Sequence, residues 1–207
     1  MRLGLLGPCQ QKPDTASLER AAEFLLMEEK VTRAIYLGAD DALEEVVSSW
    51  ARRLVGEDPT DDGAWHRAAL LASKGTPEVL DGFVKSERMR LRLRSLESLP
   101  HRILRTMEMV GDRIAVLIHD KGLLDEEDIF AANLLVYGRS DGHLVKKIGA
   151  RWFLTPGPLG PNGGILVLDD AGDEIVATVY DGRGKALHTE QLLLPRTTKM
   201  KIQGGGA

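Results

Sequence analysis

Residues 134–168 constrain the fold of this 207-residue chain more than any other stretch, because they place four short apolar runs between turns rich in glycine. Short runs of apolar and β-branched residues bounded by glycine, proline and polar clusters are typical of β-strands. The pattern predicts strands at residues 134–137, 144–148, 151–154 and 165–168. Gly138 ends the first run and is followed by three polar residues. This part of the chain is therefore expected to form strands joined by tight turns.

The first 37 residues predict a strand, a helix and a second strand. Residues 3–6 and 34–37 are short apolar runs, and each of them is stopped by a glycine. Between them, apolar residues recur at the spacing of one helix face, and Asp14 or Ser17 can cap a helix that continues to about Lys30. Strands that flank one helix in this way pair in parallel through a right-handed crossover.

The middle of the chain has mainly helical patterns. A helix is predicted from Asp41 and ends at Gly56, and residues 64–73 and 77–86 also have helical spacing. Residues 89–94 alternate apolar side chains with arginines, which indicates either a strand or the frayed end of the preceding helix. We interpret these arginines as a solvated face and not as a binding patch.

A hairpin is predicted next, at residues 103–109 and 113–118. Its second strand is almost entirely apolar, so we expect it at the centre of a sheet, with His119 at its end. The remaining predictions are a short helix at 125–132, a strand pair at 174–180 and 186–194, and a disordered tail at 199–207. The whole pattern predicts one α/β domain over residues 1–198, with layered or sandwiched sheets.

The composition is that of an ordinary globular protein, with 43% apolar and 28% charged residues. The formal net charge of −4 gives no general attraction to nucleic acid or to an anionic membrane surface. Cys9 is the only cysteine, which favours a reducing cytoplasm. No run approaches the roughly twenty apolar residues that span a bilayer, and the start of the chain lacks a signal-peptide pattern. We therefore expect a cytoplasmic protein that binds neither nucleic acid nor membrane.

The order of apolar strand, Gly138, polar residues, hairpin and then Thr155-Pro156-Gly157-Pro158 resembles the calcineurin-like metallophosphoesterases, in particular the compact bacterial phosphodiesterase type. In that family a strand ends in Gly-His-x-His, and a later strand continues into Asn-Pro-Gly-Ser. The resemblance implies two mixed β-sheets packed face to face with helices outside. It covers nearly the whole chain except residues 59–94, which are a helical insertion by this comparison.

The resemblance also implies a site for two divalent metals, which activate a hydroxide and neutralise a phosphate. Such a site needs oxygen and nitrogen ligands that converge from several strand ends, including a carboxylate that bridges the metals. The family's ligand positions fall in this chain on Pro8, Gln10, Ala39, Glu57, His119, Arg139 and Asp141.

Six of these seven positions differ from the family pattern, and only His119 matches it. Pro8 has no ligand atom, and Ala39 has no bridging carboxylate. The amide of Gln10 is a poor replacement for imidazole. The guanidinium of Arg139 repels a divalent cation because it does not lose its proton. We therefore identify the chain as a degenerate member that lacks most metal ligands.

Several of these residues have two interpretations. We interpret His119 as a structural relic and not as a metal ligand. Arg139 either pairs with Asp141 or Glu57, or binds a small phosphate anion together with His119. Cys9 is interpreted as a loop residue of the former metal pocket, since no base that would activate its thiol is identifiable.

The sequence thus predicts a protein with no catalytic residue, no metal and no cofactor, which serves as a scaffold module and binds a protein partner. The helical insertion is the candidate contact surface. One alternative is a phosphodiesterase with a rearranged site, which holds a single metal on Asp40, Glu57, His119 and Asp141. The other is a metal-free sensor of a phosphate or nucleotide ligand, centred on Arg139 and His119.

Overall fold

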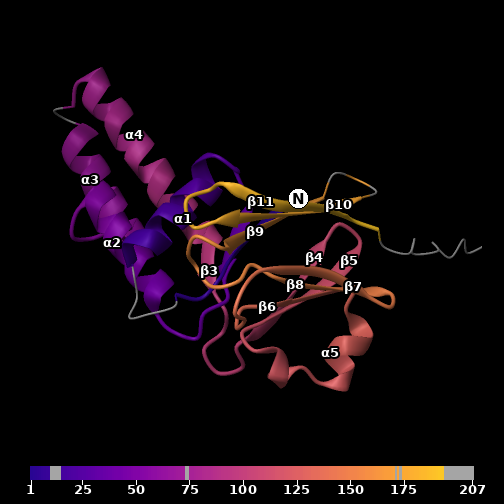
Figure 1. The fold of residues 1–207 in the computed structure, drawn as a ribbon. Coiled ribbons are helices and arrows are strands. Elements are labelled where there is room, and N and C mark those ends of the chain that lie inside the picture. Colours follow the sequence, from indigo (N-terminus) through magenta and orange to yellow (C-terminus); the bar gives the residue numbers. More distant parts are fainter. Residues whose placement is uncertain (10–14, 73–74, 171, 173, 194–207) are drawn as a thin grey trace, which may run out of the picture.

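Two mixed β-sheets pack face to face in the computed structural model, which describes residues 1–9, 15–72, 75–170, 172 and 174–193 (Figure 1). The first sheet contains, in spatial order, β11 (Ala186–Leu192), β10 (Ile175–Asp181), β9 (Gly164–Asp170), β1 (Arg2–Leu6), β2 (Arg33–Tyr36) and β3 (Leu96–Ser98). The second contains β4 (Arg105–Val110), β5 (Arg113–Ile118), β6 (Leu134–Tyr137), β8 (Arg151–Thr155) and β7 (Leu144–Ile148). The expected α/β class with two mixed sheets is confirmed.

The helices lie on the outside of this sandwich (Figure 1). They are α1 (Thr15–Met27), α2 (Ala42–Val55), α3 (Asp61–Ala72), α4 (Pro77–Arg92) and α5 (Glu126–Ala131), with short 3₁₀ turns η1 (Leu93–Ser95) and η2 (Lys121–Leu123). Within the described ranges, no helix combines the length and the apolar character that crossing a membrane requires. The predicted cap at Asp14 and the predicted tail at 199–207 lie outside the described residues.

Strand β1 lies in the middle of the first sheet and is buried on both faces. It pairs in parallel with β2, as expected for a βαβ unit. On its other side it pairs antiparallel with β9, which comes much later in the sequence. Leu3 and Leu5 point into the core between the sheets, where they meet side chains of β5, β6 and β8. Leu6 lies on the opposite face, in the core beneath the helices. A second apolar core therefore separates the first sheet from α1 and α2.

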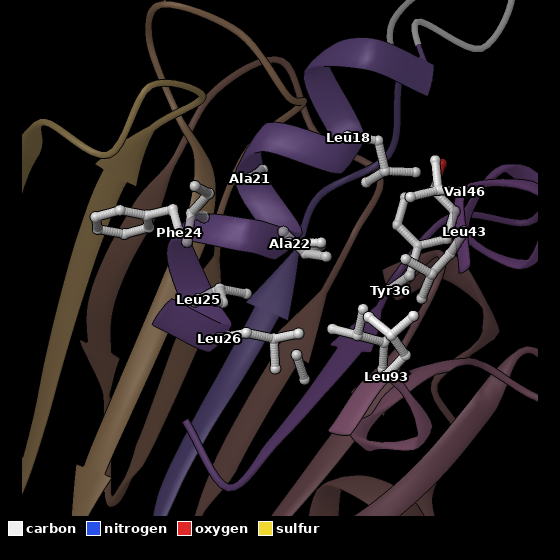
Figure 2. Close-up of a cluster of buried hydrophobic side chains, with 14 of the residues drawn as sticks. Leu18, Ala21, Ala22, Phe24, Leu25, Leu26, Tyr36, Leu43, Val46 and Leu93 are labelled. Carbon is white, nitrogen blue, oxygen red and sulfur yellow. The ribbon is translucent and has the colours of Figure 1, made fainter. Parts of the chain in front are cut away.

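Figure 2 shows this second core, in which α1 lies over the sheet. Leu18, Ala22 and Leu25 are fully buried, at the helical spacing that the sequence displays. Gly4 lets the helix approach the sheet closely, because a Cβ atom there would lie 2.9 Å from Leu25. Burial of its apolar face stabilises α1, because an isolated helix of this length is only marginally stable in water.

Strand β3 is absent from the sequence prediction. Helix α4 continues through Arg92, so residues 89–94 belong to the helix and to η1, and the strand begins only at Leu96. β3 pairs in parallel with β2, with Ser98 opposite Tyr36. It has three residues, which is too short for an alternating pattern to identify.

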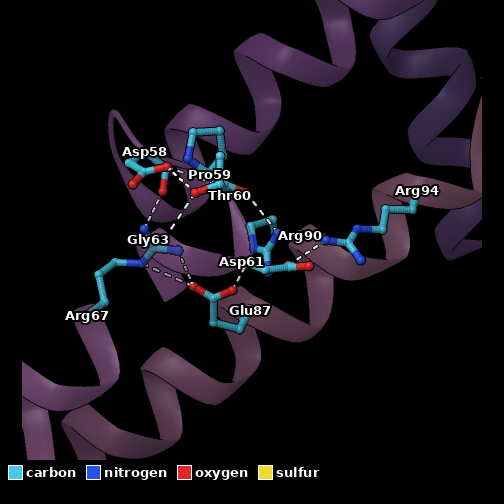
Figure 3. A network of polar contacts seen from close by, with 9 residues as sticks. All are labelled: Asp58, Pro59, Thr60, Asp61, Gly63, Arg67, Glu87, Arg90 and Arg94. Carbon is cyan, nitrogen blue, oxygen red and sulfur yellow. Dashed lines mark hydrogen bonds and ion pairs between the residues drawn. The ribbon is translucent and has the colours of Figure 1, made fainter. Parts of the chain in front are cut away.

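Charged side chains hold α3 against α4 (Figure 3). The carboxylate of Glu87 accepts hydrogen bonds from Arg67 at 2.5 Å and from Arg90 at 2.6 Å. Arg90 also donates to the carbonyl oxygen of Pro59 and to Asp61, both at 2.8 Å. Glu87 is 9% exposed and Arg90 is 6% exposed. Burial raises the pKa of Glu87, but the two guanidinium groups outweigh it and keep this pKa below its usual range.

Removal of the Glu87 carboxylate should loosen the helical hairpin that α3 and α4 form. In Glu87→Ala the guanidinium of Arg90 loses its buried partner, which costs about 3 kcal/mol, and amide exchange in α3 should accelerate about 100-fold. The control Glu19→Ala removes a partly exposed pair with Arg53, outside α3 and α4, and should not change the exchange rate in α3. Because folding lowers the pKa of Glu87, its contribution is present above the unfolded value and decreases as the pH falls. Equal exchange in the two variants would contradict this role.

Gly7 should be among the least replaceable residues of the fold. Its amide donates to the carbonyl oxygen of Gly164 at 2.8 Å, and a Cβ atom there would lie 1.8 Å from the carbonyl oxygen of Gly157. We expect Gly7→Ala to lower the free energy of unfolding in urea by about 3 kcal/mol. The matched control is Gly82→Ala in α4, where a Cβ atom meets no heavy atom within 4 Å. This change should stabilise the protein by about 0.5–1 kcal/mol.

Candidate functional site

A cavity of about 550 Å³ opens where several strands of both sheets end. Its walls are formed by four loops, which follow strands β1, β5, β6 and β8. The carboxyl ends of parallel strands are the usual place for a site in α/β proteins, because the loops that follow the strands meet there. The residues that line the cavity are Pro8, Cys9, His119, Arg139, Ser140, Asp141 and Pro158.

Four of the seven predicted positions line this cavity, namely Pro8, His119, Arg139 and Asp141. Ala39 follows β2 and is exposed, but it is not among the lining residues. Gln10 lies outside the described residues. Cys9 lines the cavity, where the sequence interpretation places it.

The structure corrects the placement of Glu57. This residue follows helix α2 and its terminal Gly56, and no strand precedes it directly. A helix of 14 residues is about 21 Å long, so the chain is far from the end of β2 when it reaches Glu57. The third parallel strand is β3, and the residues that follow it are Leu99, Pro100 and His101.

Tyr36 links the loops that follow β1 and β2. Its hydroxyl donates to Oδ1 of Asp40 at 3.0 Å and accepts a hydrogen bond from the backbone N–H of Cys9 at 3.3 Å. The ring packs on Gly38, where a Cβ atom would lie 2.2 Å from it. Burial, followed by the proximity of Cys9, raises the pKa of Tyr36 above its usual value. The phenol therefore stays neutral and works as a fixed hydrogen-bonding group between two loops.

His119 links the loop after β5 to the end of β2. Its Nδ1 lies 2.8 Å from the carbonyl oxygen of Leu37. A carbonyl oxygen only accepts hydrogen bonds, so Nδ1 carries the proton and the lone pair of the neutral ring is on Nε2. Gly138 packs against the same carbonyl group, because a Cβ atom there would lie 2.4 Å from it. Glycine after β6 is thus required by the contact with the strand end of the other sheet.

Arg139 pairs with a carboxylate that sequence reasoning did not consider. Its Nη1 donates to Oδ2 of Asp120 at 2.8 Å, so neither Asp141 nor Glu57 is the observed partner. The backbone N–H of Gly122 donates to the other oxygen of Asp120 at 2.9 Å. This backbone hydrogen bond, and after it the guanidinium of Arg139, keeps the pKa of Asp120 below its usual range. Asp120 therefore fixes the cation at the rim of the cavity.

A hydroxyl pair orders the loop after β6. Ser140 Oγ donates to the carbonyl oxygen of Gly142, and it lies 2.9 Å from Oγ1 of the buried Thr155. Thr155 in turn accepts a hydrogen bond from the backbone N–H of Gly157 at 3.1 Å. Since the proton of Ser140 is already donated, Thr155 is the donor in the pair. The loop is therefore held by hydrogen bonds within the protein.

The residues at this edge do not fit a two-metal centre. Pro8 and Ala39 provide no side-chain ligand atom, and Arg139 places a permanent positive charge at the cavity. Across the described residues, no group of three or more His, Cys, Asp or Glu side chains is arranged to hold a metal ion. The donor set that the family resemblance implies is therefore not assembled by the residues that the structure describes.

Comparison with solved structures finds similar chains that align with most of this chain. A conserved uncharacterized protein from Streptococcus pneumoniae, described as a predicted phosphoesterase, matches 93% of this chain and 98% of its own, with 11% identity and a TM-score of 0.48. An archaeal phosphodiesterase matches 94% and 100%, with 11% identity and a TM-score of 0.45. Vacuolar Protein Sorting 29 from Cryptosporidium parvum matches 92% and 97%, with 16% identity and a TM-score of 0.48.

These matches concern the metallophosphoesterase-like fold, two mixed sheets flanked by helices. No protein-family model and no curated protein matches the chain in sequence.

Loss of the Tyr36 hydroxyl should weaken the connection between the two loops. We expect Tyr36→Phe to lower the free energy of unfolding by about 1–2 kcal/mol, because Cys9 loses its acceptor and Asp40 its donor. The control Tyr137→Phe changes another buried tyrosine, for which burial is the one cause that raises the pKa. Its effect in the same urea titration should stay below about 0.5 kcal/mol.

The same variant should change the response of the protein to alkaline pH. The pKa of Tyr36 is raised in the folded state, so above pH 10 the unfolded phenol ionises while the folded one keeps its proton. The free energy of unfolding should therefore decrease as the pH rises above about 10. In Tyr36→Phe this decrease should be smaller. An identical decrease in the free energy of unfolding above about pH 10 in the wild type and in Tyr36→Phe would show that folding does not keep the phenol of Tyr36 neutral.

Proposed function

We propose that this protein has a metallophosphoesterase-like fold without phosphoesterase activity, and that it serves as a binding module for a protein partner in the cytoplasm. One observation carries the proposal. The side chains at the strand ends pair with each other, since Tyr36 links Cys9 to Asp40, His119 donates to Leu37, and Arg139 pairs with Asp120. These bonds occupy Oδ1 of Asp40 and the guanidinium of Arg139. The Nε2 lone pair of His119 by itself does not make a metal site.

The single-metal alternative has less support. Asp40 accepts from the hydroxyl of Tyr36 and from the backbone N–H of Ala42 at 3.2 Å, so its Oδ1 already has two donors. Glu57 lies after α2 and is not a lining residue of the cavity. His119 and Asp141 remain, and two donors hold a divalent metal weakly.

The phosphate-sensor alternative rests on Arg139 and His119, which line the same cavity. Its support is reduced by Asp120, because a guanidinium that already pairs with a carboxylate offers less attraction to a second anion. Asp141 adds another negative group to the cavity wall. We therefore prefer protein binding over anion sensing.

The candidate contact surface is the hairpin of α3 and α4. We take it as a helical insertion into a single domain of residues 1–198. In Figure 1 it extends away from both sheets. Trp65 is 77% exposed and Leu70 is 73% exposed, and large apolar side chains in the open favour binding to another surface.

Repair of the last motif alone should not restore hydrolysis. Arg139→His with Asp141→His recreates Gly-His-x-His beside His119, and three imidazoles are an adequate site for one zinc ion. Turnover of bis(p-nitrophenyl) phosphate with manganese should nevertheless stay at the buffer rate. Pro8 and Ala39 still provide neither a first ligand nor a bridging carboxylate, and activation of hydroxide between two metals needs both.

The comparison variant carries three further changes, Pro8→Asp, Gln10→His and Ala39→Asp. Zinc and manganese content should be measured by mass spectrometry for the wild type and for both variants. Wild-type protein that binds two metals, or turns over the diester above the buffer rate, would overturn the proposal. Turnover by the variant that carries only Arg139→His and Asp141→His would show that other residues provide metal ligands, with Asp40 as the first candidate.

A further inference from the structure

The α3–α4 hairpin has an inverted polarity. Its two most buried large side chains are charged, Glu87 and Arg90, and they belong to the network in Figure 3. Two of its large apolar side chains, Trp65 and Leu70, are 77% and 73% exposed. Helices of globular proteins ordinarily bury apolar residues and expose charged ones. The hairpin is therefore held together from within by ion pairs, and its apolar surface is left for another molecule.

Helix α4 carries a line of these exposed apolar side chains. Leu80, Val84 and Leu91 follow each other at i, i+4 and i+11, a spacing that places them along one side of a helix. Each is at least 40% exposed. Val79 lies next to the first of them and is also exposed. Glu87, at i+7 from Leu80, falls on the same side of the helix and is buried in the ion-pair network. The exposed apolar side chains therefore lie on either side of it, in the first two turns and in the last turn of α4.

The charges beside this line are distributed unevenly along the helix. Carboxylates lie at the N-terminal end, on the exposed Glu78 and Asp81, and guanidinium groups lie at the C-terminal end, on the exposed Arg88 and on Arg92. The guanidinium of Arg92 also donates to the carbonyl oxygen of Leu26 in α1. Asp81 also pairs with Lys85 on the same helix, but both side chains are mostly exposed and such a pair is easily exchanged. A second α4 in antiparallel orientation places acidic end against basic end twice. The helix is thus complementary in charge to itself.

The apolar line has the matching symmetry. Its midpoint falls between Leu80 and Leu91, so a two-fold axis there brings each of these leucines opposite the other one in the second copy. Val84 lies close to the axis. In Figure 1 the hairpin extends beyond the two sheets, so a second hairpin can approach α4 from outside. An isologous contact of this kind closes on itself and gives a dimer.

We propose that the chain forms a two-fold symmetric dimer through antiparallel contact of α4 with α4 of a second copy. This inference rests on the proposed binding function and names the partner as the chain itself. Trp65 and Leu70 of α3 extend the apolar surface of the same hairpin. The charged network then has a clear role, because it fixes α3 and α4 as one rigid unit for the contact.

Sedimentation velocity of the full chain between 1 and 100 µM measures this directly. The wild type should be dimeric in this range, and Val84→Asp should weaken the dimer at least tenfold, since it places two carboxylates near the axis. The control is Met107→Asp on β4, a more exposed apolar residue outside the hairpin, which should remain dimeric. Circular dichroism should confirm that both variants are folded, as expected for exposed positions.

Charge reversal tests the antiparallel arrangement itself. Asp81→Arg alone and Arg88→Asp alone should each weaken self-association, because each variant places like charges opposite each other twice. An equimolar mixture of the two variants should form a heterodimer as tight as the wild type, since both pairs of opposite charge are then restored. A parallel contact or an unrelated interface predicts no such rescue.

The sedimentation results can contradict the dimer or its assignment to α4. A wild-type chain that stays monomeric at 100 µM overturns the proposal, even when the hairpin captures a different protein. A dimer that survives Val84→Asp, or single charge variants that the mixture does not rescue, overturns the assignment to α4. Sedimentation does not depend on hydrolysis of a phosphodiester, so failure of the dimer and failure of the non-catalytic role are distinguishable.

Discussion

The two-sided burial of β1 is the constraint on which the rest of the structure depends. A strand with no solvent-exposed face needs an apolar layer on each side, and here one layer is the second sheet and the other is α1 with α2. Leu3 and Leu5 pack in the core between the sheets, while Gly4 leaves room for the close approach of α1. The same strand delivers Gly7, Pro8 and Cys9 to the edge where the loops of both sheets meet. Packing thus positions the cavity.

Direct hydrogen bonds connect the loops at that edge. In this chain a neutral phenol, a histidine N–H and a guanidinium make the connections. Each of them joins segments that follow different strands. These contacts therefore hold the loops of the two sheets together at the cavity.

Much of the fold could be predicted because its strands are short, apolar and bounded by glycine. Residues 134–148 fold as the pattern indicates, and Gly138 is required by contact with Leu37. The missed elements are those with weak local signals. β3 has three residues and follows a helix without a break, so the sequence pattern predicts no strand there.

The candidate site was predictable in its location and less so in its contacts. His119 and Arg139 lie at the cavity because strand order alone carries them there. The pairing of Arg139 with Asp120 depends on how two loops face each other, which residue spacing does not encode. The role of Tyr36 was missed because a tyrosine in a strand ordinarily indicates packing, and its hydroxyl finds partners only in three dimensions.

The charged interior of the hairpin gives it a different thermal behaviour from the sandwich. Unfolding of apolar cores has a large positive heat capacity, so their contribution to stability is strongly curved with temperature. Glu87 and Arg90 bury charge with little apolar surface, and the cost of removing such charges from water decreases on heating. The hairpin should therefore lose less of its stability on warming than the core between the sheets. One chain combines two structural units whose stabilities depend on temperature in different ways.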